Sequence, residues 1–183
     1  MRKLIYGINI SIDGCCNHDA FRPVEEVYDH YINLFNDVDQ IVYGRKTYEL
    51  MFPYWIEVLD DPDATKQELE FAKSITAVNK FVFSKTLTSV GENAQLAQGD
   101  LASEIQRLKQ LPGKNISLGG VDLPSQLMAL DLVDEYHFLV HPVLVGKGVH
   151  LFDYTELTGN KNLKLADKKI FNSGAVALHY VKG

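Results

Sequence analysis

The 183-residue chain is long enough for one domain with a sizeable hydrophobic core and too short for two comfortable ones. Its apolar content of 46% and charged content of 23% are ordinary for a folded globular protein. A formal net charge of −6 argues against a protein whose main task is to grip nucleic acid, and no apolar run reaches the length of a membrane span. We therefore predict a single domain over residues 1–183, with neither nucleic acid nor membrane as its partner.

The two cysteines and the first residues of the chain bear on its compartment. Cys15 and Cys16 are adjacent, which offers neither a disulfide framework nor a metal-type spacing. Cys15 could be a nucleophile, but no recognised cysteine–histidine signature surrounds it, so a structural thiol is favoured. The start of the chain resembles a signal peptide only until Asn9 and Asp13 interrupt its apolar run. These features indicate a reducing cytoplasm.

Strand and helix patterns alternate over the first two thirds of the chain. Short runs rich in β-branched and aromatic residues predict strands, and apolar residues at three- and four-residue steps predict amphipathic helices. The predicted strands cover residues 2–10, 41–43, 80–83, 94–97 and 115–118, and the predicted helices cover 23–35, 45–51, 66–75, 101–108 and 123–130. Pro23 suits a first helical position, Thr65 with Glu68 predicts a capping box, and Asp100 predicts a helix cap.

The alternation ends in the last third of the chain. Residues 135–141, 163–172 and 175–182 are three extended runs, with no helix pattern between the last two. Ser173 and Gly174 predict a tight turn that joins them. We therefore predict an α/β fold with a mixed, mainly parallel sheet flanked by helices and with antiparallel strands at the C-terminus.

Residues suited to phosphate binding follow the strand at 41–43. Gly44 stands at the passage from strand to helix, where the first helical amides have no intrahelical partner and attract anions. Arg45 and Lys46 add two cations, and Thr47 adds a hydroxyl donor. The plainer alternative is an ordinary strand-to-helix turn with a solvated basic pair.

The same kind of chemistry recurs at two later strand ends, which weakens that alternative. Ser84, Lys85 and Thr86 follow one predicted strand, and Gly119 and Gly120 follow another. Because the carboxyl ends of parallel strands share one edge, these motifs suit an extended ligand with several phosphates, such as a dinucleotide. Lys85 stands apart from the turns expected to bind the pyrophosphate, which is where the additional 2′-phosphate of NADPH would need a cation. Lys85 therefore favours NADPH over NADH. The Rossmann glycine fingerprint and the Walker lysine loop are both absent from the sequence.

Aromatic residues near the predicted loops are candidates for the wall of a substrate pocket. A dense aromatic patch at residues 51–55 is expected to follow the end of the helix at 45–51. The alternative is that these rings close the core beneath a loop, as aromatic residues usually do. The candidate pocket residues are Phe21, Tyr28, Phe52, Tyr54 and Trp55.

Two histidines lie four residues apart on a predicted strand. His137 and His141 therefore share a face, and a metal pair is conceivable. No third potential ligand follows at a spacing typical of metal-binding motifs, and Pro142 indicates that the strand ends there. Core or interface histidines are the favoured interpretation, so we predict no metal site.

Three motifs in this order resemble the NADPH-contacting motifs of the dihydrofolate reductase superfamily. They are residues 44–48 (GRKTY), residues 82–87 (VFSKTL) and the pair Gly119-Gly120. More narrowly, residues 11–14, 132–135 and 141–148 resemble the reductase domain at the C-terminus of the bifunctional riboflavin-biosynthesis deaminase/reductase. The similarity covers nearly the whole chain, and the deaminase half with its zinc motif has no counterpart in it.

This resemblance implies roles for individual residues. Gly44, Arg45, Lys46 and Thr47 should hold the cofactor's pyrophosphate and 2′-phosphate side, Ser84 and Lys85 the adenosine 2′-phosphate, and Gly119 and Gly120 the pyrophosphate and nicotinamide side. Family members commonly carry arginine where Lys85 stands, so a point charge replaces a bidentate contact. Asp29 falls near the first-helix acid that protonates the pterin in dihydrofolate reductases, though with a different spacing to Gly44. Asp13 is the second candidate catalytic acid.

The resemblance further implies a cytoplasmic NADPH-dependent reductase that transfers hydride to a small pyrimidine- or pteridine-like substrate. The closest activity is that of 5-amino-6-(5-phosphoribosylamino)uracil reductase in riboflavin biosynthesis. The alternatives are a dihydrofolate reductase-type activity, a non-catalytic nucleotide-binding module of the same fold, or a phosphate-binding carrier without nicotinamide chemistry.

A homodimer is also expected. Residues 135–141 and 175–181 carry apolar side chains on both alternating faces, so something must cover the second face. No helix pattern lies nearby in the sequence to do so, and a partner subunit is the simplest cover. Related reductases are commonly dimers.

Overall fold

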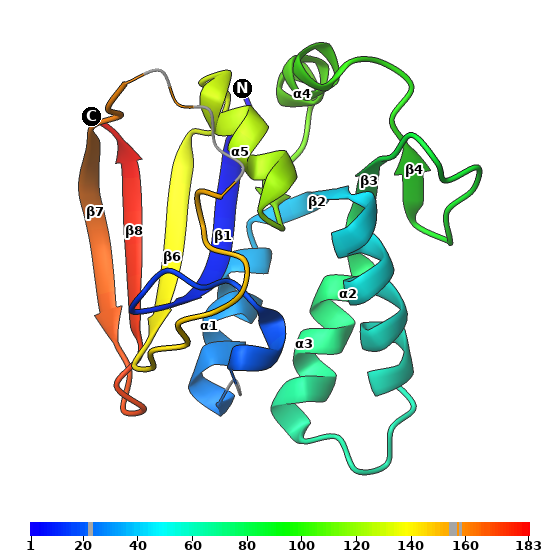
Figure 1. Cartoon of the computed structure of the whole chain (residues 1–183). Coiled ribbons are helices and arrows are strands. Elements are labelled where there is room, and N and C mark those ends of the chain that lie inside the picture. Colours follow the sequence, from blue (N-terminus) through cyan, green and yellow to red (C-terminus); the bar gives the residue numbers. More distant parts are fainter. Residues whose placement is uncertain (22–23, 154–156, 158) are drawn as a thin grey trace. The chain divides into compact units, whose positions relative to one another are not determined.

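A computed structural model describes residues 1–21, 24–153, 157 and 159–183 (Figure 1). Their contacts divide the chain into two compact units. The first unit is Met1–Arg2 with Pro23–Ser117, and the second is Lys3–Arg22 with Leu118–Gly183. Within the described residues, no helix combines the length and the apolar character needed to cross a bilayer.

The first unit pairs parallel strands with helices. Its elements are α1 (Glu25–Phe35), β2 (Val38–Gly44), α2 (Arg45–Val58), α3 (Lys66–Ala77), β3 (Asn79–Phe83), β4 (Ala94–Leu96), α4 (Leu101–Gln110) and β5 (Asn115–Leu118), whose last residue belongs to the second unit. The strand order is β4-β3-β2-β5, with β2 parallel to β3 and β3 parallel to β4.

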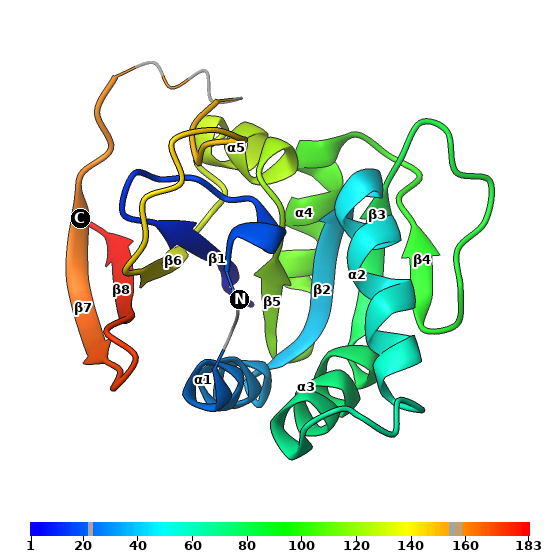
Figure 2. The same cartoon turned by 60° about the horizontal axis from the view of Figure 1, so that its bottom comes forward.

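Alternation along β2 and β3 builds a core on one face of these strands. Ile41, Tyr43 and Val82 join a buried cluster to which α1, α2 and α3 contribute. Phe81 points the other way and lies under the guanidinium of Arg107 from α4, at 5.8 Å from the ring centroid. Helices α2 and α3 therefore cover one face and α4 the other (Figure 2).

Two predicted helix caps are confirmed in the first unit. The Thr65 hydroxyl accepts from the Glu68 amide at 3.2 Å, and the Glu68 carboxylate accepts from the Thr65 amide at 2.8 Å, which completes a capping box at α3. Asp100 accepts from the Ser103 amide at 3.0 Å at the start of α4. Pro23, expected as the first residue of its helix, lies outside the described residues.

The predicted end of the helix near residue 51 is wrong. Helix α2 continues to Val58 with Pro53 inside it. A proline in a helix interior removes one backbone hydrogen bond, which predicts a break. Here the turn beyond Pro53 carries Trp55 and Val58, both 7% exposed, and burial of these two side chains holds the last turn in place.

The second unit holds the remaining strands. Its elements are β1 (Leu4–Ser11), the 3₁₀ turn η1 (His18–Ala20), α5 (Asp122–Ala129), β6 (Glu135–His141), β7 (Leu163–Ile170) and β8 (Val176–Lys182). The strand order is β1-β6-β8-β7 (Figure 1). Strands β1 and β6 are parallel, whereas β8 is antiparallel to both β6 and β7.

A tight turn joins the last two strands. The Phe171 amide donates to the Ala175 carbonyl at 2.9 Å, and Gly174 adopts a φ of +83°, a conformation that favours glycine. The pairs β1–β6, β2–β3 and β3–β4 are parallel, whereas the C-terminal pairs β6–β8 and β7–β8 are antiparallel. The predicted fold class, a mixed and mainly parallel sheet with helices and antiparallel C-terminal strands, is confirmed.

Candidate functional site

Two of the three predicted phosphate-binding motifs lie side by side in the first unit. In the parallel register of β2 and β3, Gly44 pairs with Phe83, and each is the last residue of its strand. Arg45 and Ser84, the next residues of each chain segment, therefore leave the sheet at neighbouring positions on one edge. This edge is the carboxyl end of the strands, where ligands bind in open α/β sheets.

The first turn of α2 carries two basic side chains. Gly44 occupies the N-cap with a φ of −78°, which is an ordinary extended conformation. The strand-to-helix turn therefore does not require a positive φ at this glycine. The first turn holds Arg45 and Lys46 and no acidic residue. Cations at a helix N-terminus oppose the helix dipole and destabilise it by about 0.3–1 kcal/mol each. A bound anion would reverse that penalty.

Arg45 already has a partner on its own helix. Its Nη1 lies 2.7 Å from Oε2 of Glu49, and both side chains are more than a third exposed. An exposed pair one turn apart contributes only about 0.3–0.5 kcal/mol. The guanidinium can therefore exchange Glu49 for a phosphate at little cost, while Lys46 is already exposed to solvent.

The Ser84 hydroxyl shapes the turn that presents Lys85. It accepts hydrogen bonds from the Thr86 amide at 3.1 Å and the Leu87 amide at 2.9 Å. Such a serine turn fixes the backbone locally. Lys85 is exposed at the tip of this turn, next to the start of α2.

Tyr48 has a role that the sequence did not reveal. Its hydroxyl accepts a hydrogen bond from the Gly91 amide at 2.9 Å, and its ring stacks on Phe52 with centroids 5.3 Å apart. A Cβ at Gly91 would come within 3.1 Å of the Phe52 ring. Tyr48 therefore ties the loop after β3 to α2, and the glycine permits that close approach.

The third motif belongs to the second unit. Gly119 and Gly120 follow β5, and Gly120 has a φ of +94°, which favours glycine. The Gly120 carbonyl accepts from the Tyr6 hydroxyl of β1 at 2.9 Å. Helix α5 begins shortly afterwards at Asp122.

The two candidate acids occupy contrasting environments. In the second unit, the Asp13 carboxylate accepts from the Ser11 hydroxyl, from the Gly146 amide at 2.7 Å and from the Val145 amide at 3.2 Å. These hydrogen bonds, that of Ser11 foremost, lower the pKa of Asp13 to about 2. An acid that is ionised at neutral pH does not donate a proton readily, so this geometry gives Asp13 the task of holding the loop at 145–146. Asp29 is exposed on α1 in the first unit.

Two of the five aromatic candidates lie in the core of the first unit. Tyr28 and Trp55 are 9% and 7% exposed, with their rings 6.1 Å apart and edge to face. Both contact Phe71 of α3. Their positions fit the alternative in which these rings close the core.

The other three aromatic candidates lie nearer to solvent or in the second unit. Tyr54 is 52% exposed and packs edge-on against Trp55, and Phe52 is half-buried beneath Gly91. In the second unit, Phe21 stacks on the buried His141 with ring centroids 4.6 Å apart. The His141 Nε2 lies 3.0 Å from Oδ1 of Asn9, and burial lowers the pKa of this imidazole.

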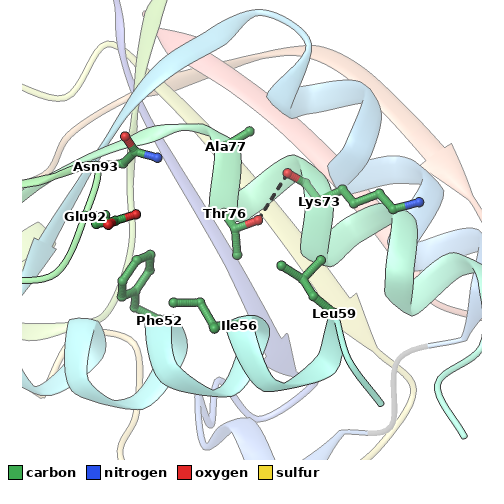
Figure 3. Close-up of a pocket in the computed structure, with 8 residues that line it drawn as sticks. All are labelled: Phe52, Ile56, Leu59, Lys73, Thr76, Ala77, Glu92 and Asn93. Atoms are coloured by element: carbon green, nitrogen blue, oxygen red, sulfur yellow. Dashed lines mark hydrogen bonds between the residues drawn. The ribbon is translucent and has the colours of Figure 1, made fainter. Parts of the chain in front are cut away.

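A cavity of about 360 Å³ lies at the other end of the first unit's strands (Figure 3). Residues of α2 and α3 and the residues just before β4 surround it. Its lining is Phe52, Ile56, Leu59, Lys73, Thr76, Ala77, Glu92 and Asn93. Of the predicted site residues, Phe52 reaches it, and the phosphate-binding motifs do not contribute to it.

Lys80 is buried close to this cavity. Its Nζ donates to the Thr76 carbonyl at 2.6 Å and lies 4.7 Å from the centroid of the Phe52 ring. Burial lowers the pKa of Lys80 to about 8. The neighbouring ring and carbonyl stabilise the charge that remains at neutral pH.

Together, the strand order of each unit and the positions of the three motifs define a protein of the dihydrofolate reductase-like α/β class. The family described as the RibD C-terminal domain matches residues 2–178, and the chain belongs to this family. This membership confirms the resemblance to the reductase domain of riboflavin biosynthesis.

Three similar proteins illustrate the relationship. The YyaP protein of Bacillus subtilis strain 168, itself described as uncharacterized, is 32% identical over 98% of this chain and 94% of its own length. A protein of Shewanella sp. PV-4, provisionally described as a riboflavin biosynthesis protein, shares the fold with a TM-score of 0.76 and 22% identity, over 100% of this chain and 99% of its own.

The third similar protein is a bifunctional enzyme. It is the diaminohydroxyphosphoribosylaminopyrimidine deaminase/5-amino-6-(5-phosphoribosylamino)uracil reductase of Thermotoga maritima, with a TM-score of 0.71 and 12% identity. The match covers 100% of this chain and 57% of the Thermotoga chain. At this identity the likeness shows the fold alone.

Proposed function

We propose that the protein is an NADPH-dependent oxidoreductase that reduces a small pyrimidine- or pteridine-like substrate, with an activity similar to 5-amino-6-(5-phosphoribosylamino)uracil reductase. The observation that carries this proposal is the pairing of Gly44 with Phe83. It brings two phosphate-seeking motifs from separate parts of the sequence to one sheet edge. Family membership in the RibD C-terminal domain supports the same activity.

The residues at this edge fit the anionic parts of NADPH. The first amides of α2, the Thr47 hydroxyl and the two cations Arg45 and Lys46 offer donors for a pyrophosphate. Lys85, presented by the neighbouring turn, offers a point charge for the 2′-phosphate. When bound, NADPH would supply the hydride, and the task of these residues is to bind and orient it.

The second unit carries the third motif of the resemblance, Gly119 and Gly120, which we propose to contact the pyrophosphate and nicotinamide side of the cofactor. Gly120 adopts a positive φ that favours glycine, and the Tyr6 hydroxyl donates a hydrogen bond to its carbonyl. Asp13 holds the loop at Val145 and Gly146, which lies among the residues that resemble the reductase domain. We place the reaction in the cytoplasm, in line with the free thiols of Cys15 and Cys16, and we propose a homodimer as the working form.

Binding and turnover test the proposal separately. Purified protein should bind NADPH more tightly than NADH in calorimetric titrations, and it should oxidise NADPH when offered ribosylamino-pyrimidine or pteridine substrates. The absence of NADPH binding, with binding of ATP or a sugar phosphate instead, would favour a phosphate-binding carrier.

A non-catalytic nucleotide-binding module is the second candidate function. The favouring observation is that the Asp13 carboxylate is ionised and engaged with a loop, while Asp29 is exposed to solvent. NADPH binding without oxidation across the whole substrate panel would favour this second function over the first.

A further inference from the structure

Three side chains of the second unit meet on one face of the sheet. Side chains two residues apart on a strand share a face, so Glu135 and His137 of β6 do so. The antiparallel register of β6 and β8 pairs His137 directly with His179. His137 therefore lies beside His179, which is 42 positions further along the chain, and its neighbour in this cluster is not His141 of its own strand.

The distances among these side chains suit a small metal ion. The Nε2 of His179 lies 3.1 Å from Oε2 of Glu135, and the Nε2 of His137 lies 3.6 Å from the same oxygen. The possible ligand atoms of all three residues lie within 4.8 Å of one another. A tetrahedral ion with bonds of about 2.0–2.2 Å separates its ligand atoms by roughly 3.3–3.6 Å, so small side-chain rotations would complete the geometry.

The cluster is partly sheltered and still reachable. The side chains of Glu135 and His137 are 10% and 14% exposed, whereas that of His179 is 27% exposed. The two imidazole rings stack with centroids 4.1 Å apart and an angle of 21° between their planes. An ion could thus enter past His179 and keep one position open to water.

Lys3 orients the carboxylate in this cluster. Its Nζ lies 2.5 Å from Oε1 of Glu135, which leaves Oε2 directed at the two imidazoles. A partner on the outer oxygen of a ligating carboxylate is a common device for fixing its direction. The Lys3 side chain is 59% exposed, so its charge is well screened by solvent.

We propose that Glu135, His137 and His179 form a binding site for a divalent transition-metal ion, with Zn²⁺ as the preferred occupant. Two imidazole nitrogens and one carboxylate oxygen suit Zn²⁺, Co²⁺ or Ni²⁺, whereas Ca²⁺ and Mg²⁺ require a shell of oxygen ligands. The ion would link β6 to the C-terminal strand β8. Glu135 begins β6, roughly 20 Å along the strand from His141 at its other end.

Metal titration of protein that carries no histidine tag tests the proposal. Calorimetry with Zn²⁺ alone should show one site per chain, and Co²⁺ should give the visible absorption of a tetrahedral nitrogen–oxygen site. Single His137→Gln and His179→Gln variants should each weaken Zn²⁺ binding by roughly tenfold or more. His18→Gln is the matched control, because His18 is exposed on η1 and should leave binding unchanged.

A second measurement guards against variants that fail to fold. Saturating Zn²⁺ should raise the unfolding temperature of the wild-type protein and of His18→Gln, and it should not raise that of folded His179→Gln. Wild-type protein that takes up no Zn²⁺ at one equivalent would overturn the proposal. A His137→Gln/His179→Gln double variant that still binds Zn²⁺ with wild-type affinity would overturn it as well. Either result would mean that the three side chains form only a hydrogen-bonded network around Glu135.

Discussion

The hydroxyl of Tyr48 on α2 accepts a hydrogen bond from the amide of Gly91, 43 residues along the chain. This contact fastens the far end of the loop that begins at Ser84, while the Ser84 hydroxyl fastens its near end. The turn that presents Lys85 is therefore held at both sides. The conformation of this turn should therefore depend on the Tyr48 hydroxyl, although we do not expect Tyr48 itself to contact a phosphate.

Tyr48→Phe tests this dependence. The change leaves the ring in place and removes the acceptor for the Gly91 amide, so we expect stability to fall by about 1 kcal/mol and NADPH affinity to fall by several-fold. Chemical denaturation and calorimetric titration measure the two effects. Tyr54→Phe is the matched control, because Tyr54 is 52% exposed. Equal affinities for wild type and Tyr48→Phe would mean that the loop needs no such anchor.

Arg45→Ala should weaken NADPH binding by about 1–3 kcal/mol, the usual loss when a charge-assisted hydrogen bond is removed from a partly buried site. Glu49→Ala is the companion variant. It frees the guanidinium from its 2.7 Å partner and should leave NADPH affinity unchanged or slightly higher. Unchanged binding in Arg45→Ala by calorimetry would refute the phosphate role of this residue.

Lys85→Ala should erode the distinction between the two nicotinamide cofactors. If Lys85 meets the 2′-phosphate, its removal should weaken NADPH by roughly tenfold, or about 1.4 kcal/mol, and change NADH little. Lys85→Arg should keep or strengthen the preference, because a guanidinium can contact a phosphate through two hydrogen bonds. Equal losses for both cofactors would identify Lys85 as an ordinary surface charge.

Asp13 should contribute to stability in a way that depends on pH. Its folded-state pKa of about 2 lies below the value of about 3.9 for an unfolded aspartate. A lowered carboxyl pKa stabilises the fold above the unfolded value, and that contribution is lost as the pH falls from about 4 to 2. In urea unfolding at several pH values, the stability difference between wild type and Asp13→Asn should therefore shrink over this range. A constant difference would show that the charge of Asp13 is irrelevant to the loop.

The homodimer is tested by light scattering at micromolar protein concentration. The chain has a mass of 20.6 kDa, so a dimer should scatter as a particle of about twice that mass. Strand β7 is the outer strand of its sheet, and its Ile170 and Leu165 are 73% and 45% exposed. Ile170→Lys should weaken the association if this edge takes part, and a clean monomer of the wild type would reject the dimer.

Local chemistry in the sequence was enough to predict most of the elements and both tested caps. Periodicity is a property of neighbouring residues, so the alternation of strands and helices and the hairpin at Gly174 could be read directly. The caps at Thr65 and Asp100 depend on residues three positions away. The helix beyond Pro53 could not be predicted, because the burial of Trp55 that stabilises it depends on the distant Phe71.

The details of the sites depend on strand register, which a single sequence does not reveal. The pairing of Gly44 with Phe83 supports the inferred adjacency of two motifs, and that inference required only parallel strands. The meeting of His137 with His179, and of Asp13 with the loop at Gly146, joins segments whose separations carry no local signal. Tyr48 belongs to the GRKTY motif, but no sequence pattern indicates that its hydroxyl accepts a hydrogen bond from the Gly91 amide.

The parallel pairing of β1 with β6 also sets the order in which the second unit can assemble. Ile5 pairs with Glu135, 130 positions further along, whereas β7 and β8 adjoin each other in sequence. A ribosome adds about 5–20 residues per second, so β1 leaves the ribosome on the order of ten seconds before its partner exists. Its buried residues Leu4, Ile5 and Tyr6 stay without their native cover for that time. During synthesis, these apolar residues therefore wait longer for their partner strand than the residues of β7, whose partner β8 follows within a few residues.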